Sequence, residues 1–256
     1  GRPMSHLFDL TGRNAIVTGG ASGIGKAIAV GLAEAGANVL VADLNLPGAQ
    51  ATAKAVQSLG RQGYAFDVDV TNECQVEAMV ARARDVFPSI DISFNIPGIN
   101  IRKPVLELSL AEYKRVLEVN LVGVFICAKS VGKVMVEQRR GKMVNMSSIM
   151  GHISLGRLSA YASAKGGVSQ LTRTLAVEWA PYGVNVNAIC PGYTRTPLVA
   201  GLMRDEVLLA DLTRRVPMGR LAEPEEIVGA AVFLSSDAAS YVTGISLFVD
   251  GGFMAW

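Results

Sequence analysis

The sequence alternates short apolar runs with longer helical patterns, and this alternation constrains the fold more strongly than any other feature. Seven runs are expected to form strands: Asn14–Thr18, Asn38–Asp43, Gly63–Phe66, Ile90–Phe94, Lys142–Met146, Val184–Ile189 and Ser246–Val249. The clearest helical patterns between the first six are Ile24–Ala35, Cys74–Phe87, Leu110–Gln138 and Ser159–Trp179. Strands that alternate with helices form βαβ units around a parallel sheet. We therefore predict an α/β fold, a doubly wound, mostly parallel seven-stranded sheet with helices on both faces (Rossmann fold).

A single domain spanning residues 1–256 is expected, because the sequence contains no Pro/Ser-rich linker, repeat or low-complexity segment. One connection, residues 191–223, is long and contains a predicted short helix near Leu202–Leu212, before a further helix from Pro224. Its apolar side chains favour a segment that closes over a ligand, and a loose surface loop is the alternative. Residues 1–3, ahead of Met4, are typical of a cloning remnant.

Charge and cysteine content argue against several functions. The 24 Lys and Arg residues nearly balance the 22 Asp and Glu residues and are scattered, so a nucleic-acid partner is not expected. Cys74, Cys127 and Cys190 have no metal-binding spacing, so neither a metal site nor a disulfide is expected. The sequence suggests no membrane span and no signal peptide, and the free cysteines favour the reducing cytoplasm.

A glycine-rich turn follows the first predicted strand: Thr18-Gly19-Gly20-Ala21-Ser22-Gly23-Ile24-Gly25. Glycines let the backbone approach a pyrophosphate closely, and the N-terminus of the next helix attracts phosphate charge. The spacing differs from the common G-x-G-x-x-G pattern, so an ordinary strand–helix turn is the alternative. The turn by itself indicates a dinucleotide site only weakly.

Asp43 strengthens the case for a dinucleotide, because it ends the second predicted strand about twenty residues after the turn. An acidic side chain at that position can hydrogen-bond a ribose diol and would repel a 2′-phosphate. The next residues, Leu44 and Asn45, are not basic. The sequence therefore favours NAD over NADP, and a simple turn or cap residue is the alternative for Asp43.

Ser148, Tyr161 and Lys165 could move a proton during hydride transfer. Tyr161 and Lys165 stand at i, i+4 on one face of a predicted helix. A nearby ammonium, together with the positive nicotinamide of NAD⁺, would lower the pKa of the tyrosine from its usual value of about 10 and make it a usable base. Ser148 would hold the substrate oxygen. A Y-x-x-x-K spacing also arises by chance, so the indication depends on its combination with the glycine turn.

With these motifs in this order, the chain resembles the single-domain type of the short-chain dehydrogenase/reductase family. The glycine turn matches T-G-x-x-x-G-[IL]-G, and Ser148, Tyr161 and Lys165 match the S…Y-x-x-x-K core. Further matches are Asp69-Val70, Asn120, and Pro191-Gly192 with Thr194 and Thr196. The resemblance runs from about Leu10 to Gly252. One departure is Asn95-Ile96-Pro97-Gly98 in place of N-N-A-G, which puts local stability or cofactor affinity in doubt.

The resemblance implies a set of roles and partners. It implies that Asn120, Ser148, Tyr161 and Lys165 are catalytic, that Asn120 anchors a water, and that Lys165 also grips the nicotinamide ribose. The implied cofactor-binding residues are Gly19, Ser22, Gly23, Ile24, Gly25, Asp43, Leu44, Asp69, Val70, Asn95, Gly98, Tyr161, Lys165, Pro191, Gly192, Thr194 and Thr196. It also implies a homotetramer built on the helices 110–138 and 159–179, with the tail Phe253–Trp256 against a neighbouring subunit.

Loops near residues 99–104 and 151–159 are expected to border a small-molecule substrate. Arg102 could clamp a carboxylate, or be a solvated surface arginine. His152 could orient a hydroxyl, or be a plain loop residue. The pattern is similar to family members acting on sugar acids and polyols, such as gluconate 5-dehydrogenases and galactitol dehydrogenase. The alternatives are a 3-oxoacyl-(acyl-carrier-protein) reductase and a catalytically idle NAD-binding protein.

Overall fold

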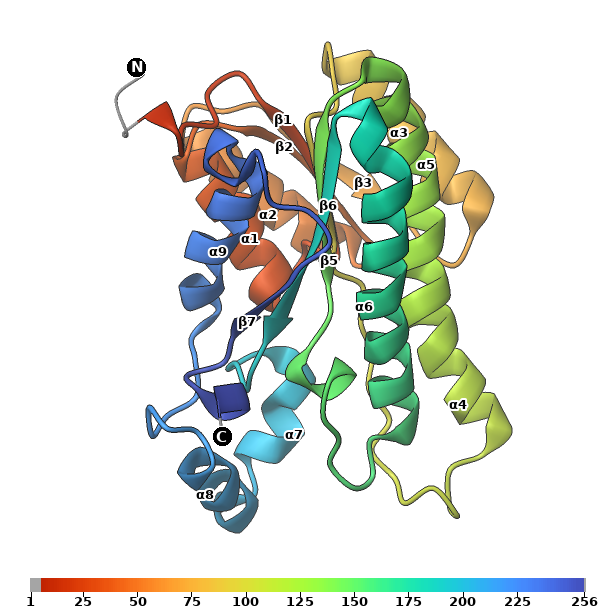
Figure 1. The fold of residues 1–256 in the computed structure, drawn as a ribbon, viewed down its shortest axis with the longest axis vertical. Coiled ribbons are helices and arrows are strands. Elements are labelled where there is room, and N and C mark those ends of the chain that lie inside the picture. The colour runs from red at the N-terminus through yellow and green to blue at the C-terminus, as the bar shows by residue number, and fades with distance from the viewer. Residues whose placement is uncertain (1–5, 256) are drawn as a thin grey trace.

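The computed structural model describes residues 6–255, apart from the side chain of Leu202. The expected cloning remnant at residues 1–3 and the terminal Trp256 lie outside this range. Within it the chain forms one layered α/β body around a central sheet (Figure 1).

The sheet has seven strands, all paired in parallel, in the order β3-β2-β1-β4-β5-β6-β7. The strands are β1 (Asn14–Thr18), β2 (Asn38–Asp43), β3 (Gly63–Asp67), β4 (Ile92–Asn95), β5 (Gly141–Met146), β6 (Val184–Pro191) and β7 (Ser246–Val249). This confirms the predicted fold class, because apolar runs buried on both faces are typical of parallel strands. The order reverses between β1 and β4, where doubly wound sheets open a crevice beyond their carboxyl ends.

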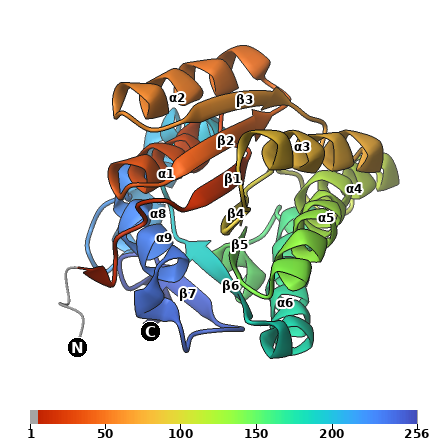
Figure 2. The same ribbon diagram turned by 90° about the horizontal axis from the view of Figure 1, so that it is seen from above.

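Helices cover both faces of the sheet, as Figure 2 shows. One face carries α1 (Gly23–Glu34), α2 (Leu46–Ser58) and α9 (Val228–Ser235), and the other carries α3 (Glu73–Val86), α4 (Leu110–Leu117), α5 (Gly123–Gln138) and α6 (Ser159–Trp179). Each face buries its own apolar core, with Ile28 and Leu32 of α1 in the first and Met79 and Met135 of α3 and α5 in the second. The two cores hold the strand ends in fixed positions.

The expected helix Leu110–Gln138 contains a break in its regular winding. A π-helical turn at Glu118–Val122 separates α4 from α5. Contrary to the sequence-based expectation, the stretch 110–138 is long and apolar enough to span a membrane by length and composition alone. More than half of its apolar window, 56%, is buried inside the protein, as in a core helix.

The connection 191–223 contains the turn Pro197–Val199 and the helices α7 (Ala200–Met203) and α8 (Glu206–Arg214). A turn at Pro224–Ile227 then leads into α9. The C-terminal tail was expected to pack on a neighbouring subunit. Within the chain, Phe253 and Met254 are half-buried against a small cluster that includes Ile149 and Leu158, and the contact with a neighbouring subunit stays a prediction. This intramolecular packing follows from hydrogen bonds that fold the tail back at Asp250.

Candidate active site

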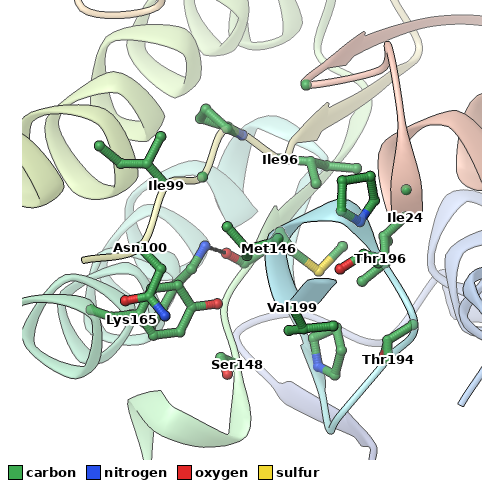
Figure 3. A pocket seen from close by; sticks show the side chains of 18 of the residues that line it. Ile24, Ile96, Ile99, Asn100, Met146, Ser148, Lys165, Thr194, Thr196 and Val199 are labelled. Carbon is green, nitrogen blue, oxygen red and sulfur yellow. Dashed lines mark hydrogen bonds between the residues drawn. The ribbon is translucent and has the colours of Figure 1, made fainter. Parts of the chain in front are cut away.

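A cavity of about 670 Å³ lies beyond the carboxyl ends of the strands. This volume falls in the range of small-molecule and cofactor sites. The cavity is bordered by the glycine turn, the segment after β4, the end of β5, the start of α6 and the connection after β6. Figure 3 shows Ile24, Ser148, Lys165 and Thr196 converging on it from different elements. Nearly all the predicted site residues line it, and the exceptions are Asn95, Asn120 and His152.

The glycine turn is shaped so that side chains could not replace its hydrogens. Gly19 has φ +74°, and a Cβ there would meet the Ile96 carbonyl oxygen at 2.5 Å. A Cβ on Gly25 would meet the Gly19 carbonyl oxygen at 2.0 Å. Ser22, the N-cap of α1, makes no side-chain cap hydrogen bond. The first-turn N–H groups of α1 are therefore not capped by a side chain, which suits a pyrophosphate.

Two carboxylates line the cavity near this turn. Asp43 accepts hydrogen bonds from the backbone N–H groups of Ala21 (3.0 Å) and Asn45 (2.9 Å), which fixes its carboxylate at the end of β2. Asp69 accepts from the backbone and hydroxyl of Thr71, and these bonds lower the pKa of its carboxyl group. Both groups are ready acceptors for ribose or adenine donors.

The departure at Asn95-Ile96-Pro97-Gly98 leaves the link between strands intact. The Asn95 amide donates to the Asn145 side chain (2.8 Å), which in turn donates to Thr172 of α6 (3.0 Å). β4, β5 and α6 are thus tied together without an asparagine at position 96. Ile96 and Gly98 line the cavity, whereas Asn95 lies behind the wall.

Asn120 sits in the π-helical turn and is fully buried. Its side-chain oxygen accepts from the backbone N–H of Ile99 (2.8 Å), and its amide donates to the Ile99 carbonyl (2.9 Å). This pair of bonds fixes the loop after β4, which lines the cavity at Ile99 and Asn100. π-helical turns recur at functional sites, where they redirect a side chain. The sequence marked Asn120 only through the family motif.

Tyr161 and Lys165 share one face of α6, with the Lys165 Nζ atom 5.7 Å from the centre of the Tyr161 ring. Lys165 donates to the Met146 carbonyl at the end of β5 (2.8 Å), as Figure 3 shows. Burial lowers the pKa of Lys165 to about 8. Burial also raises the pKa of Tyr161 to about 12, and a hydrogen bond with Ser148 acts in the opposite direction. In the protein by itself, desolvation therefore opposes the lowering of the tyrosine pKa that the ammonium and the nicotinamide are expected to produce.

His152 and Arg102 differ in their relation to the cavity. The His152 ring contacts Ser169 (3.1 Å) and Cys190 (3.6 Å) and packs edge-on against Phe248, and it does not line the cavity. This position does not support a direct contact with substrate. Arg102 lines the cavity.

Sequence reasoning missed several residues of the cavity wall. Met146, Met150, Arg115 and Tyr193 line it without belonging to any motif used for the prediction. Tyr193 lies between the motif residues Gly192 and Thr194, and this position was the only sequence feature that could have placed it at the site. Among the described residues, no group of three or more His, Cys, Asp or Glu side chains could hold a metal ion.

Comparison with known proteins agrees with this geometry. The family model described as enoyl-(acyl carrier protein) reductase matches residues 19–254. The cis-4-hydroxycyclohexanecarboxylate dehydrogenase of Sinomonas cyclohexanicum is 46% identical over 244 residues, which is 95% of this chain and 97% of that protein. The 5-keto-D-gluconate 5-reductase of Escherichia coli K12 is 37% identical over 251 residues, 98% of this chain and 99% of that protein.

A gluconate 5-dehydrogenase from Burkholderia cenocepacia, solved in complex with NADP and tartrate, superimposes with a TM-score of 0.95. It is 35% identical, and the match covers 98% of this chain and 99% of that one. The chain belongs to the short-chain dehydrogenase/reductase family. It is an oxidoreductase that acts on CH–OH groups with a nicotinamide cofactor.

Proposed function

We propose that the protein transfers a hydride between NAD(H) and the secondary alcohol or ketone of a sugar acid, sugar, polyol or cyclic hydroxy acid, with Tyr161 as the acid/base. The observation that carries the proposal is the grouping of Ser148, Tyr161 and Lys165 in the cavity that the glycine turn also lines. The names of the relatives from S. cyclohexanicum and E. coli both specify an oxygenated carboxylic acid, which supports this substrate class.

The cavity suits the dinucleotide, because its glycine turn has no room for side chains and the first turn of α1 has no side-chain cap. The residues that would hold the cofactor are the turn itself, Asp43, Asp69, Lys165 and the segment from Pro191 to Thr196. The nicotinamide supplies the hydride acceptor in oxidation and the hydride donor in reduction. Proton transfer and substrate orientation are left to the chain.

Tyr161 takes the hydroxyl proton of the alcohol in oxidation and returns it to the carbonyl oxygen in reduction. Ser148 holds the same oxygen, and its hydroxyl is positioned by the Met150 N–H, from which it accepts (3.1 Å). The Lys165 ammonium favours the phenolate as it forms. Asn120 positions the loop after β4 through its two bonds with Ile99. The proposal also includes a water molecule anchored by Asn120.

NAD is proposed as the preferred cofactor because of Asp43. A 2′-phosphate beside its carboxylate would bring like charges together, and the neighbouring cavity residue Leu44 offers no cation. The relative from B. cenocepacia binds NADP, so the preference has to be measured. If Asp43 sets the cofactor preference, Asp43→Ser will raise the KM for NAD⁺ and reduce the ratio of kcat/KM for NAD⁺ to kcat/KM for NADP⁺.

The test of the function is absorbance of reduced nicotinamide with NAD⁺ or NADP⁺ and a panel of gluconate, polyols and cis-4-hydroxycyclohexanecarboxylate. Turnover of one of these, reduced about 10²- to 10⁴-fold in Tyr161→Phe, is the expected result. Turnover of 3-oxoacyl thioesters alone, or full activity of Tyr161→Phe, would overturn the proposal. A homotetramer and a cytoplasmic location also belong to the proposal, and sedimentation of the purified protein tests the first.

A further inference from the structure

Three hydrogen bonds run in series behind the cavity wall, from His152 to the helix that carries Tyr161 and Lys165. The His152 Nε2 atom lies 3.1 Å from the Ser169 hydroxyl, and that hydroxyl lies 2.7 Å from the Ser147 hydroxyl. The Ser147 hydroxyl in turn contacts the backbone carbonyl of Lys165 (2.9 Å). Both serines are buried, where hydrogen bonds are stronger than in water. We call these linked groups the His152 network.

The hydrogen positions in the His152 network follow from the number of donors. The Lys165 carbonyl has no hydrogen, so Ser147 donates its single hydroxyl hydrogen there. The contact between the two serines then requires the Ser169 hydroxyl as donor, which leaves Ser169 only lone pairs for the histidine. The His152 Nε2 atom must therefore carry a hydrogen, and the neutral ring is the Nε2–H tautomer.

The same count excludes His152 as a base for Cys190. The Cys190 Sγ atom lies 3.6 Å from Nε2, so the two groups could be taken for a nucleophile and its base. A base would need a lone pair on Nε2, and that position holds the hydrogen donated to Ser169. Burial also raises the pKa of the Cys190 thiol, which disfavours the reactive thiolate. His152 therefore acts as a hydrogen-bond donor to Ser169.

The His152 network joins the two segments that carry the reacting groups. Ser147 and the following Ser148 stand directly after β5. Lys165 and Ser169 lie on successive turns of α6, the helix that also carries Tyr161. The proposed reaction brings the Ser148 and Tyr161 hydroxyls to the same substrate oxygen. The His152 network therefore helps to set the separation between these two hydroxyls.

The turn Ile149–Gly151, which leads from Ser148 to His152, is closely packed on α6. A Cβ on Gly151 would meet the Lys165 carbonyl oxygen at 2.7 Å. The His152 N–H donates to the first carbonyl of the turn (3.0 Å), and its ring packs edge-on against Phe248, with the ring centres 4.9 Å apart. The imidazole is thus fixed beside α6, with Nε2 directed at Ser169.

We propose that His152 is a positioning residue for hydride transfer, whose Nε2–H group holds the segment of Ser148 against the helix of Tyr161. The inference rests on the proposed function and deepens it, because it names a residue outside the cavity on which the alignment of the two reacting hydroxyls depends. His152 touches no reacting atom. Loss of its donor should therefore lower kcat and leave the KM for the cofactor unchanged.

The tautomer can be observed directly by NMR, because the chain has only two histidines. In protein labelled with ¹⁵N-histidine, two-bond ¹H–¹⁵N correlations identify the nitrogen that carries the hydrogen. At pH 8 the His152 ring is neutral, because burial lowers its pKa below the ordinary value of 6.5. We expect its Nε2 atom to be fully protonated, and His6→Gln, at an exposed position, assigns the signals. An Nδ1–H ring, or averaging between the two tautomers, would overturn the proposal.

Two amide substitutions separate positioning from stability. A glutamine amide reaches about as far as Nε2 and can still donate to Ser169, whereas an asparagine amide ends near the position of Nδ1. His152→Gln should therefore keep kcat within about threefold of wild type, and His152→Asn should lower it roughly 10- to 100-fold, as for a misplaced reacting group. Both are assayed well below their melting temperatures, so that only folded protein is compared. Equal kcat values for the two variants would refute the positioning role.

The Met150 N–H, which donates to the Ser148 hydroxyl (3.1 Å), provides a readout without turnover. Its exchange with solvent should be faster in His152→Asn than in His152→Gln, because the Ser148 segment is no longer held against α6. Equal exchange would overturn the inference. A wild-type protein with the Nε2–H tautomer and this difference in exchange, but without turnover of any hydroxy acid, would overturn the proposed function and leave the His152 network standing.

Discussion

Burial acts on Tyr161 and Lys165 in opposite directions, and both effects favour the neutral side chain. It raises the pKa of Tyr161 to about 12 and lowers that of Lys165 to about 8. At pH 7 the tyrosine is therefore a protonated phenol, ready to donate, while the lysine is still mostly charged. The resting site is prepared for carbonyl reduction, and oxidation requires the phenol to lose its proton.

This protonation predicts opposite pH responses for the two directions of the reaction. Between pH 7 and 10 the rate of alcohol oxidation at saturating cofactor should rise, because the fraction of Tyr161 phenolate grows about tenfold per pH unit below its pKa. The rate of ketone reduction should not rise over the same interval. Initial rates in both directions measure this, with Tyr161→Phe as the background. An oxidation rate that falls from pH 7 to 10 would contradict the assignment.

The buried ammonium of Lys165 should also lower the free energy of unfolding at neutral pH. Below pH 8 it is charged in both folded and unfolded chains, and burying that charge is unfavourable. Between pH 8 and the unfolded value of 10.5, the unfolded chain binds more protons, so stability rises with pH and the cost disappears. Lys165→Met should therefore be more stable than wild type by about 2 kcal/mol at pH 7 and by much less at pH 10.5. Urea unfolding at the two pH values tests this, and a Met variant less stable at pH 7 would refute it.

At the scale of elements, what the sequence predicted and what it missed have different physical origins. β1 and β2 were predictable because strands buried on both faces are continuous apolar runs, and α6 because burial imposes a period of 3.6 residues on its side chains. The π-helical turn at 118–122 was not, because a single wider turn barely disturbs the helical pattern. In the same way, the motifs located Ser148, Tyr161 and Lys165, whereas the position of His152 behind the wall depends on how loops pack.

The π-helical turn leads to a stability prediction. Asn120→Leu removes both bonds with Ile99 and leaves the N–H and carbonyl of this half-buried residue without those partners. The free energy of unfolding should fall by about 2–4 kcal/mol, which corresponds to a loss of roughly 5–15 °C in Tm. Glu118→Leu, at an exposed position in the same turn, is the control and should change stability by about 0.5 kcal/mol or less. Equal effects of the two variants in calorimetry would show that the Asn120 bonds do not hold the loop.

At the scale of the whole molecule, the cavity draws its walls from segments distributed along most of the chain, from Gly19 to Leu208. A ligand that fills it binds only when these segments are assembled, so binding and global stability are linked. NAD⁺ at a hundred times its Kd should therefore add about 2.7 kcal/mol to the stability of the folded protein. The same shift from NADP⁺ should need a higher concentration if Asp43 sets the preference. Melting curves over a concentration series of each cofactor measure it, and no shift with either would contradict dinucleotide binding.

The strand order also has a consequence for how the protein is made. β1 pairs with β2 on one side and with β4 on the other. As the chain leaves the ribosome, β1, β2 and β3 can pair as soon as they emerge, but the inner edge of β1 stays open until residues 92–95 arrive. That edge is an apolar, unsatisfied template in the nascent chain. The interval between β3 and β4 is therefore one in which the growing chain is exposed to misassociation with its neighbours, and in which chaperones can protect it.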